Sequence, residues 1–424
     1  MQIDIRAKAL RWLLIGVEIA VLVVIIVWVG RACVADMLSN KPTTGNLERA
    51  VKLDPNNAGL YMKLGSLYEY NPIDMQLGKA EENFRRATHL DSYDPQTWLD
   101  LAAALQFQGR VDEAEACRRR VDLLAPKIPA YQWPLANFYL LQGNTEEALR
   151  HFRLVLAGTS QYDANVFRMA WKSTDDAGKI LQEVIPERVT TEFSYLNYLL
   201  SQHHLDEAQP VWNRILDSNE EFSAKDASPY IDTLIAGHKP DEAYQVWTDL
   251  EKKGLIRSSS GTNIIFDGDF EDEFLNFGFA WRINPLEGVY AGIDGSTFHS
   301  PSHALTVQFS GKDNLEYAHV YQYVKVSPGH AYHLQALMRT EGITTDSGPR
   351  LEVYDAYNPP ALDKLTEDLT GTTEAWTTVL LDFVTGPKTE LLVVRLKRVP
   401  SKKLDNLIAG RVWLDDVQLT PAQK

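Results

Sequence analysis

The sequence has little cysteine and no excess of positive charge. Its 424 residues include two cysteines, and 42 basic against 57 acidic residues give a net charge of −15 at pH 7. Two cysteines cannot build a metal framework, so we expect Cys33 and Cys117 to be unpaired. A negative chain without a basic stripe is also a poor partner for the phosphates of nucleic acid. We therefore expect no nucleic-acid partner.

Catalytic motifs are missing as well. The sequence has no nucleophile elbow, no HExxH pair, no P-loop and no dinucleotide-binding glycine pattern. Asp415 and Asp416 are adjacent, and neighbours on a strand point to opposite faces, so they do not form a catalytic pair. We expect the protein to have no catalytic residues, not to be an enzyme and to require no cofactor.

One long apolar run stands near the N-terminus. Residues 12–30 read WLLIGVEIAVLVVIIVWVG, and as a helix they would extend roughly 28 Å, close to the hydrocarbon thickness of about 30 Å of a bilayer. Arg6, Lys8 and Arg11 precede the run, and basic residues favour the cytoplasmic side. The pattern predicts a cytoplasmic tail (1–11), a transmembrane signal anchor (12–30) in a bacterial inner membrane, and a periplasmic remainder.

Two other interpretations of this segment stay open. A cleaved signal peptide would usually have a shorter apolar stretch, although Gly30-Arg31-Ala32 offers a small-x-small cleavage pattern. A lipoprotein would need small or aliphatic residues at the positions directly before Cys33, and Arg31, two residues before it, breaks that pattern. Glu18 lies within the run, where an acid marks a partner contact, reaches toward the interface or is simply protonated.

A repeat follows the apolar run. Leu101-Ala102 with Ala114 recurs 34 residues later as Leu135-Ala136 with Ala148. Large and small residues at this period resemble tetratricopeptide repeats (TPR), in which pairs of helices stack. The resemblance is specific for residues 58–157 and looser beyond, and it implies an all-α solenoid over residues 41–257 that binds a protein partner.

In TPR proteins, ligand-facing positions lie on the first helix of each pair. We expect an apolar and aromatic groove for a helix or an extended peptide, although any one of its residues could instead belong to the core. The candidates are Met62, Leu99, Phe107, Trp133, Asn137, Leu141, Phe193 and Asn197.

The hydrophobic period then changes from helical to alternating. Residues 258–262 (SSSGT) read as a flexible linker, and alternating runs punctuated by Pro-Gly and Gly-Pro follow it. Such runs predict a β-sandwich over residues 263–420. The expected strands are 304–309, 319–326, 331–339, 351–357, 376–384, 391–399 and 412–419.

This last region resembles carbohydrate-binding modules of the family 4/9 type. The opening Asn263-Ile264-Ile265 with Asp267-Gly268-Asp269-Phe270-Glu271, and the closing Trp413-Leu414-Asp415-Asp416-Val417, carry the resemblance. It implies a jelly roll with a structural calcium ion, for which Glu271 and Asp416 would supply carboxylates, unless they only cap strand ends. For glycan stacking it implies aromatic residues, and the candidates are Tyr290, Tyr317, Tyr321 and Tyr323.

The sequence thus predicts a multidomain protein with an N-terminal transmembrane helix, an all-α TPR solenoid and a C-terminal all-β jelly-roll sandwich. The function that we expect is a non-enzymatic envelope scaffold that binds a protein through its repeats and a glycan through its sandwich, in polysaccharide assembly or export. A protein–protein assembly factor without sugar binding, and an accessory protein of a glycan-active enzyme, are the alternatives.

Overall fold

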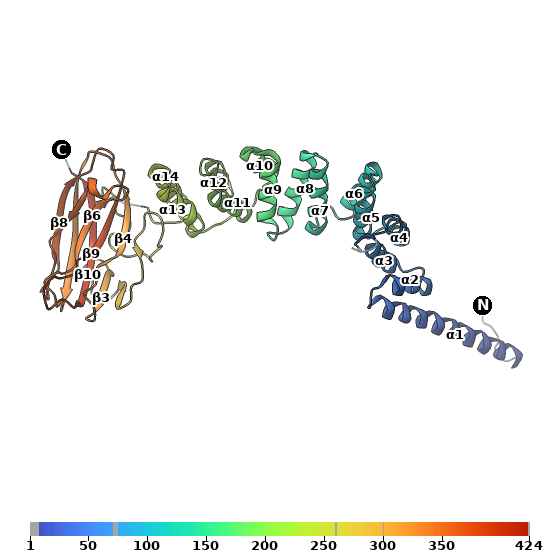
Figure 1. The fold of residues 1–424 in the computed structure, drawn as a ribbon. Coiled ribbons are helices and arrows are strands. Elements are labelled where there is room, and N and C mark those ends of the chain that lie inside the picture. Colours follow the sequence, from blue (N-terminus) through green and yellow to red (C-terminus); the bar gives the residue numbers. More distant parts are fainter. Residues whose placement is uncertain (1–7, 71–74, 259–260, 300, 423–424) are drawn as a thin grey trace. The chain divides into compact units, whose positions relative to one another are not determined.

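The computed structural model describes residues 8–422 apart from 71–74, 259–260 and 300 (Figure 1). The chain divides into two compact units, residues 1–186 and 187–424. Most of the predicted cytoplasmic tail and the linker residues Ser259 and Ser260 lie outside the described residues.

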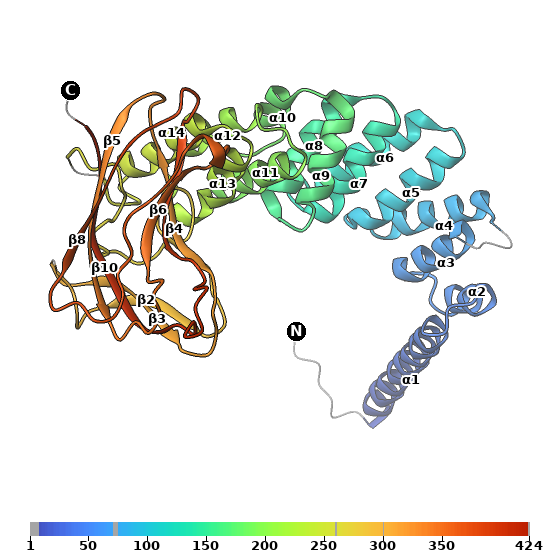
Figure 2. The same cartoon turned by 60° about the vertical axis from the view of Figure 1, so that its left-hand side comes forward.

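The first unit begins with a single long helix, α1 (Lys8–Ser39), which is long and apolar enough to cross a membrane. Its last turns pack against α2 (Thr44–Leu53), and Ala35 is 1% exposed where it meets this neighbour. Figures 1 and 2 both show α2 beside the C-terminal end of α1. The helix that contains the apolar run therefore also serves as the first helix of a helical hairpin.

Pairs of helices make up the rest of this unit. Alanines let the paired helices approach closely, since Ala80, Ala102, Ala114, Ala136 and Ala148 have no exposed surface. Asp94 caps one helix by accepting hydrogen bonds from the backbone of Gln96 and Thr97. The helices are α3 (Ala58–Tyr70), α4 (Leu77–Leu90), α5 (Pro95–Phe107), α6 (Val111–Leu124), α7 (Pro129–Leu141), α8 (Thr145–Gly158), α9 (Asp163–Thr174) and α10 (Ala177–Glu183).

The second unit starts with further helical hairpins. Trp212 of one hairpin and Trp247 of the next are both buried, as are Ala208 and Ala243. The elements are α11 (Val189–Ser201), α12 (Ala208–Asp217), the 3-10 turn η1 (Ala224–Ala227), α13 (Ser228–Ala236) and α14 (Pro240–Lys252).

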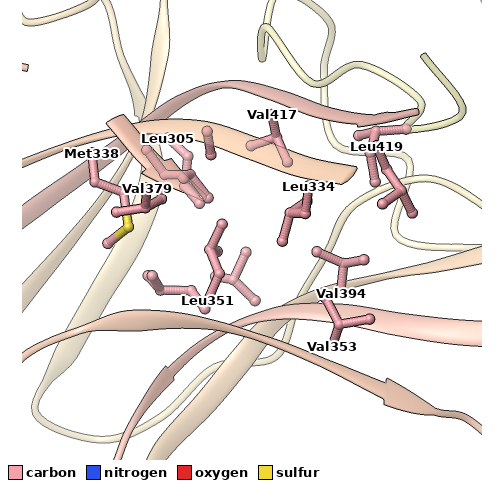
Figure 3. Close-up of a cluster of buried hydrophobic side chains, with 14 of the residues drawn as sticks. Leu305, Leu334, Met338, Leu351, Val353, Val379, Val394, Val417 and Leu419 are labelled. Atoms are coloured by element: carbon pink, nitrogen blue, oxygen red, sulfur yellow. The ribbon is translucent and has the colours of Figure 1, made fainter. Parts of the chain in front are cut away.

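Two five-stranded antiparallel sheets follow and form a sandwich. Sheet A has the strand order β1-β4-β9-β6-β7 and sheet B the order β2-β3-β10-β5-β8. Alternating residues of both sheets fill the space between them, as the labelled Leu334, Leu351 and Val394 show in Figure 3. The strands are β1 (Arg282–Ile283), β2 (Val289–Asp294), β3 (Ala304–Ser310), β4 (Tyr317–Lys325), β5 (Ala331–Glu341), β6 (Arg350–Asp355), β7 (Asp363–Leu365), β8 (Thr377–Val384), β9 (Leu391–Arg398) and β10 (Ala409–Pro421).

The hairpin α13–α14 packs directly on the sandwich. The ring of Trp247 lies 5.1 Å from that of Phe266 and 5.9 Å from that of Phe279, both of which precede β1. Gly278 has φ +57, and a Cβ there would lie 2.8 Å from the Trp247 ring, so a side chain would disrupt this contact. The structure therefore groups residues 187–257 with the sandwich, whereas the sequence pattern places a boundary at 258–262.

Candidate ligand-binding sites

The outer face of sheet A carries tyrosines and charged residues. Tyr321 and Tyr323 alternate along β4 with the buried Val320, Gln322 and Val324, and so point outward. Tyr321 stands opposite Arg395 of β9, which stands opposite Glu352 of β6, and Tyr354 lies on the same face one step further along β6. We call these five residues the tyrosine face.

The tyrosine face offers ring planes beside polar groups. The rings of Tyr321 and Tyr323 lie 5.7 Å apart and nearly perpendicular, and the Arg395 guanidinium lies 4.5 Å from the Tyr354 ring centre. Burial raises the pKa of Tyr323 and Tyr354, so both hydroxyls stay protonated. Stacking planes with adjacent donors and acceptors are what a sugar ring and its hydroxyls require.

Glu352 organises the charges of this face. Its carboxylate is 1% exposed and accepts hydrogen bonds from Arg395 Nε and Lys397 Nζ. A buried carboxylate needs such partners because an unpaired charge away from water is costly. Removal of Glu352 would therefore leave both cations without their shared partner.

The helical hairpin reaches the same face. Arg282 of β1 lies 5.1 Å from the Tyr323 ring centre, and its Nη2 donates to Oδ1 of Asp232 of α13 at 2.6 Å. Two residues further along β4, at its C-terminal end, Lys325 pairs with Asp241 of α14 at 2.9 Å. Part of the outer face of sheet A is therefore bounded by helices.

The other two predicted glycan residues lie elsewhere. Tyr290 is 59% exposed but belongs to β2, in the opposite sheet. Tyr317 is 1% exposed and packs edge-on against Phe309 at 5.5 Å, and burial raises its pKa well above the usual value. A ring this deeply buried cannot stack on a sugar, so we leave Tyr317 out of the tyrosine face.

Sequence reasoning missed Tyr354, Arg395 and Glu352. Alternation along β6 and β9 places their side chains outward, and this signal was available in the sequence. Their position beside Tyr321 and Tyr323 depends on the β4-β9-β6 strand order, which alternation alone does not provide.

Glu271 contacts Ser302 and His303, and Asp416 contacts His299. Glu271 accepts hydrogen bonds from the backbone N–H groups of Ser302 and His303 at 2.9 and 2.8 Å, and Asp416 Oδ2 lies 2.5 Å from His299 Nδ1. Burial alone would raise the pKa of Glu271, but the hydrogen bonds from Ser302 and His303 lower it to about 2. Both carboxylates thus face one loop, Glu271 in its ionised form.

This arrangement fits the predicted calcium ion in part. Hard carboxylate oxygens suit calcium, but the described residues contain no group of three or more His, Cys, Asp or Glu side chains that could hold a metal. Backbone carbonyls or water would have to supply the other oxygen ligands, and an ion would compete with His299 for Asp416. The calcium ion stays a prediction.

The predicted groove residues of the repeats divide into three groups. Leu99 and Phe193 are 9% and 8% exposed; Leu99 belongs to a buried cluster, and Phe193 packs edge-on against Trp212 and Phe222. Phe107 and Leu141, each at the end of its helix, are 68% and 81% exposed, which leaves them available to a partner. Met62, Trp133 and Asn137 are half-buried and Asn197 is exposed; Trp133 also stacks on Tyr162 at 5.4 Å.

Two acids lie close together on the first helices of neighbouring repeats. Glu69 of α3 is 3% exposed, and its pKa is raised to about 7 by burial and by the charge of Asp100. Burial likewise raises the pKa of Asp100, on α5, to about 6. The sequence predicts an apolar and aromatic groove on the first helices of the repeats. Glu69 and Asp100 show that these helices also carry acidic groups.

Comparison with known proteins agrees with this description of the helices. A tetratricopeptide-repeat family model matches residues 95–120 and 129–153, which confirms the predicted repeats there. No curated protein matches the sequence.

Solved structures resemble separate parts of the chain. A CBM4 structure matches at 14% identity with a TM-score of 0.27, covering 37% of this chain and 99% of that one. Pseudomonas aeruginosa pilF matches at 14% identity with a TM-score of 0.26, and the match covers 54% of this chain and 91% of the pilF chain. The enzymatically active domain of bacteriophage CBA120 tailspike protein 4 matches at 14% identity with a TM-score of 0.28; 38% of this chain covers 22% of the tailspike domain. None of these likenesses assigns an activity.

Proposed function

We propose that this protein is a non-enzymatic scaffold of a bacterial cell envelope. In this proposal α1 anchors the chain in the inner membrane as a single span, the repeats bind a protein partner, and the sandwich binds a glycan in the periplasm. Its work is the assembly or export of polysaccharide. The observation that carries the proposal is the tyrosine face, where ring planes and the Arg395–Glu352 pair stand together on one sheet.

Glycan binding can be tested with the full chain in mild detergent. We expect a panel of immobilised polysaccharides to include at least one ligand, and Tyr321→Ala to weaken its binding roughly tenfold through loss of a stacking plane. Tyr290→Ala is the matched control, because Tyr290 is an exposed tyrosine on the opposite sheet. Equal losses in the two variants would contradict the proposed face.

The repeats support the protein-binding part of the proposal. Phe107 and Leu141 are large apolar side chains exposed at the ends of α5 and α7. Burial of such side chains by a partner contributes favourably to the free energy of binding. We expect Phe107→Ser with Leu141→Ser to abolish copurification of a partner cross-linked in cells, with the melting midpoint unchanged. Copurification at the wild-type level would argue against this surface.

The anchor and its orientation need their own test. We expect the full-length chain in the membrane fraction, with its sandwich digested by protease added to spheroplasts, because Arg11 precedes the apolar run and favours the cytoplasmic side. If the sandwich were protected from protease until the cells were lysed, the chain would have the opposite orientation, with its sandwich in the cytoplasm.

A second candidate function is protein–protein assembly without sugar binding. The observation in its favour is that α14 already contacts the outer face of sheet A through Asp241 with Lys325. In the loop after β6, the Tyr357 hydroxyl also donates to the backbone oxygen of Ile235 of α13 at 2.8 Å. A polysaccharide panel that shows no binding to the wild-type chain would favour this alternative.

A further inference from the structure

A groove lies where α1 meets the turn between α2 and α3, and its volume is about 430 Å³. One wall consists of Val23, Val24, Val27 and Trp28, which belong to the apolar run, and the other consists of residues 53–56. Val24, Val27 and Trp28 are 67%, 56% and 67% exposed, so this wall continues the apolar surface of the span.

The depth of the groove is fixed by hydrogen bonds. Arg31 follows directly on the apolar run, and its Nε and Nη2 donate to the backbone oxygens of Leu53 and Lys52 at 3.1 and 3.2 Å. The α2–α3 turn therefore lies at the level of Arg31, where the hydrocarbon of a bilayer ends and the phosphates begin. The packing of Ala35 against α2 holds it there.

We propose that this groove binds one phospholipid with an amine-bearing, zwitterionic headgroup, an inference that rests on the proposed membrane anchor. The acyl chain lies against Val24, Val27 and Trp28. The lipids of the bilayer surround the span, and one of them therefore also fills the groove in its surface. Arg31 has five N–H donors, and those not directed at Leu53 and Lys52 face the lipid phosphate.

The charges around the groove select the headgroup. Arg31 on one wall and Asp54 on the other are of opposite sign, so a lipid that carries both a phosphate and an ammonium group finds a partner for each. An anionic lipid such as phosphatidylglycerol would satisfy Arg31 and would be repelled by Asp54. Trp28 suits the same depth, since tryptophan favours the membrane–water interface.

The test uses the full chain in vesicles of equal parts phosphatidylethanolamine and phosphatidylglycerol, extracted in mild detergent for native mass spectrometry. We expect the wild-type chain to retain one phosphatidylethanolamine, and Arg31→Gln to lower its occupancy about tenfold through loss of charge-assisted hydrogen bonds. Arg11→Gln, at the other end of the span, is the matched control and should retain the lipid.

A second variant covers the case in which Arg31→Gln disturbs the hairpin. Val27→Trp leaves all charges in place and fills the groove, so we expect it to lose the lipid with unchanged helicity. Unchanged occupancy in both variants, equal loss in Arg11→Gln, or preferential retention of phosphatidylglycerol would overturn the lipid site while the anchor stands. Recovery of a soluble chain cleaved near Ala32 would overturn the anchor and the lipid site together.

Discussion

The carboxylate of Asp232 on helix α13 joins the helical hairpin to two places in the sandwich. Its Oδ1 accepts hydrogen bonds from Arg282 Nη2 at 2.6 Å and from the backbone N–H of Gly278 at 2.9 Å. Arg282 in turn lies over the ring of Tyr323. A helix of the second unit thus helps to hold one residue of the tyrosine face in position.

We expect Asp232→Asn to weaken glycan binding several-fold while costing no more than about 1 kcal/mol of stability, as is usual for a partly exposed ion pair. The reason is that Arg282 loses the carboxylate that holds it over Tyr323. Binding to the polysaccharide found with the wild-type chain measures the effect. Asp241→Asn, which breaks the exposed pair with Lys325, is the control; wild-type affinity in both variants would show that α13 does not position the face.

Trp247→Ala should destabilise the second unit by about 3–5 kcal/mol, the usual cost of removing a large buried aromatic side chain. Trp247 is 1% exposed and contacts rings on the sandwich side. Denaturant unfolding of the full chain, followed by circular dichroism in the β region, measures it. Tyr244→Ala is the comparison, because Tyr244 contacts Phe279 but is 41% exposed. Equal effects would mean that the hairpin does not stabilise the sandwich.

Glu69→Gln should stabilise the first unit above pH 7 and have little effect near pH 5. The native pKa of Glu69 is about 7, above the usual value for an unfolded chain, so the native state holds its proton longer. The free energy of unfolding of the wild-type chain therefore falls as pH rises from about 4.5 through 7, by on the order of 1–3 kcal/mol. Melting midpoints across this range provide the measurement, and a pH-independent difference between the two chains would contradict it.

Calcium should raise the melting midpoint of the sandwich if Glu271 and Asp416 hold the predicted ion, and we expect EDTA to lower it. Glu271→Gln should remove the calcium dependence, because a neutral amide is a weak ligand for a hard cation. Glu273→Gln, a nearby acid outside the pair, is the control. An identical midpoint with calcium and with EDTA would leave the two carboxylates only as hydrogen-bond anchors of the loop.

The sequence predicted the repeated elements of the fold well, because their signals are periodic. Alanines every 34 residues mark the places where helices touch, and the alternating runs coincide with β3 to β6 and β8 to β10. The short strands β1, β2 and β7 were not predicted. β1 and β7 have two and three residues, too few to show an alternation, and β2 contains Gly292, which weakens the strand signal.

The candidate sites were less predictable because they depend on neighbours distant in sequence. Tyr321 and Tyr317 lie four residues apart on one strand, yet a register shift after Tyr317 leaves one ring outward and the other buried. Leu99 and Phe193 occupy repeat positions that often face a ligand, but close packing with adjacent helices buries them. Asp232 has no local signal at all, since its role comes from the packing of α13 on β1.

If α1 anchors the chain as proposed, its unbroken course from the apolar run into the first hairpin means that the whole first hairpin rotates with the anchor in the bilayer. Each residue of an α-helix advances the direction of its side chains by about 100°. One residue inserted within the span would turn Ala35 and the packed α2 by that angle relative to the lipid-facing side, and would carry the α2–α3 turn away from its present neighbours in the membrane. In the proposed anchor, the length of the span therefore sets not only how deep the helix lies but also which way the first repeat faces.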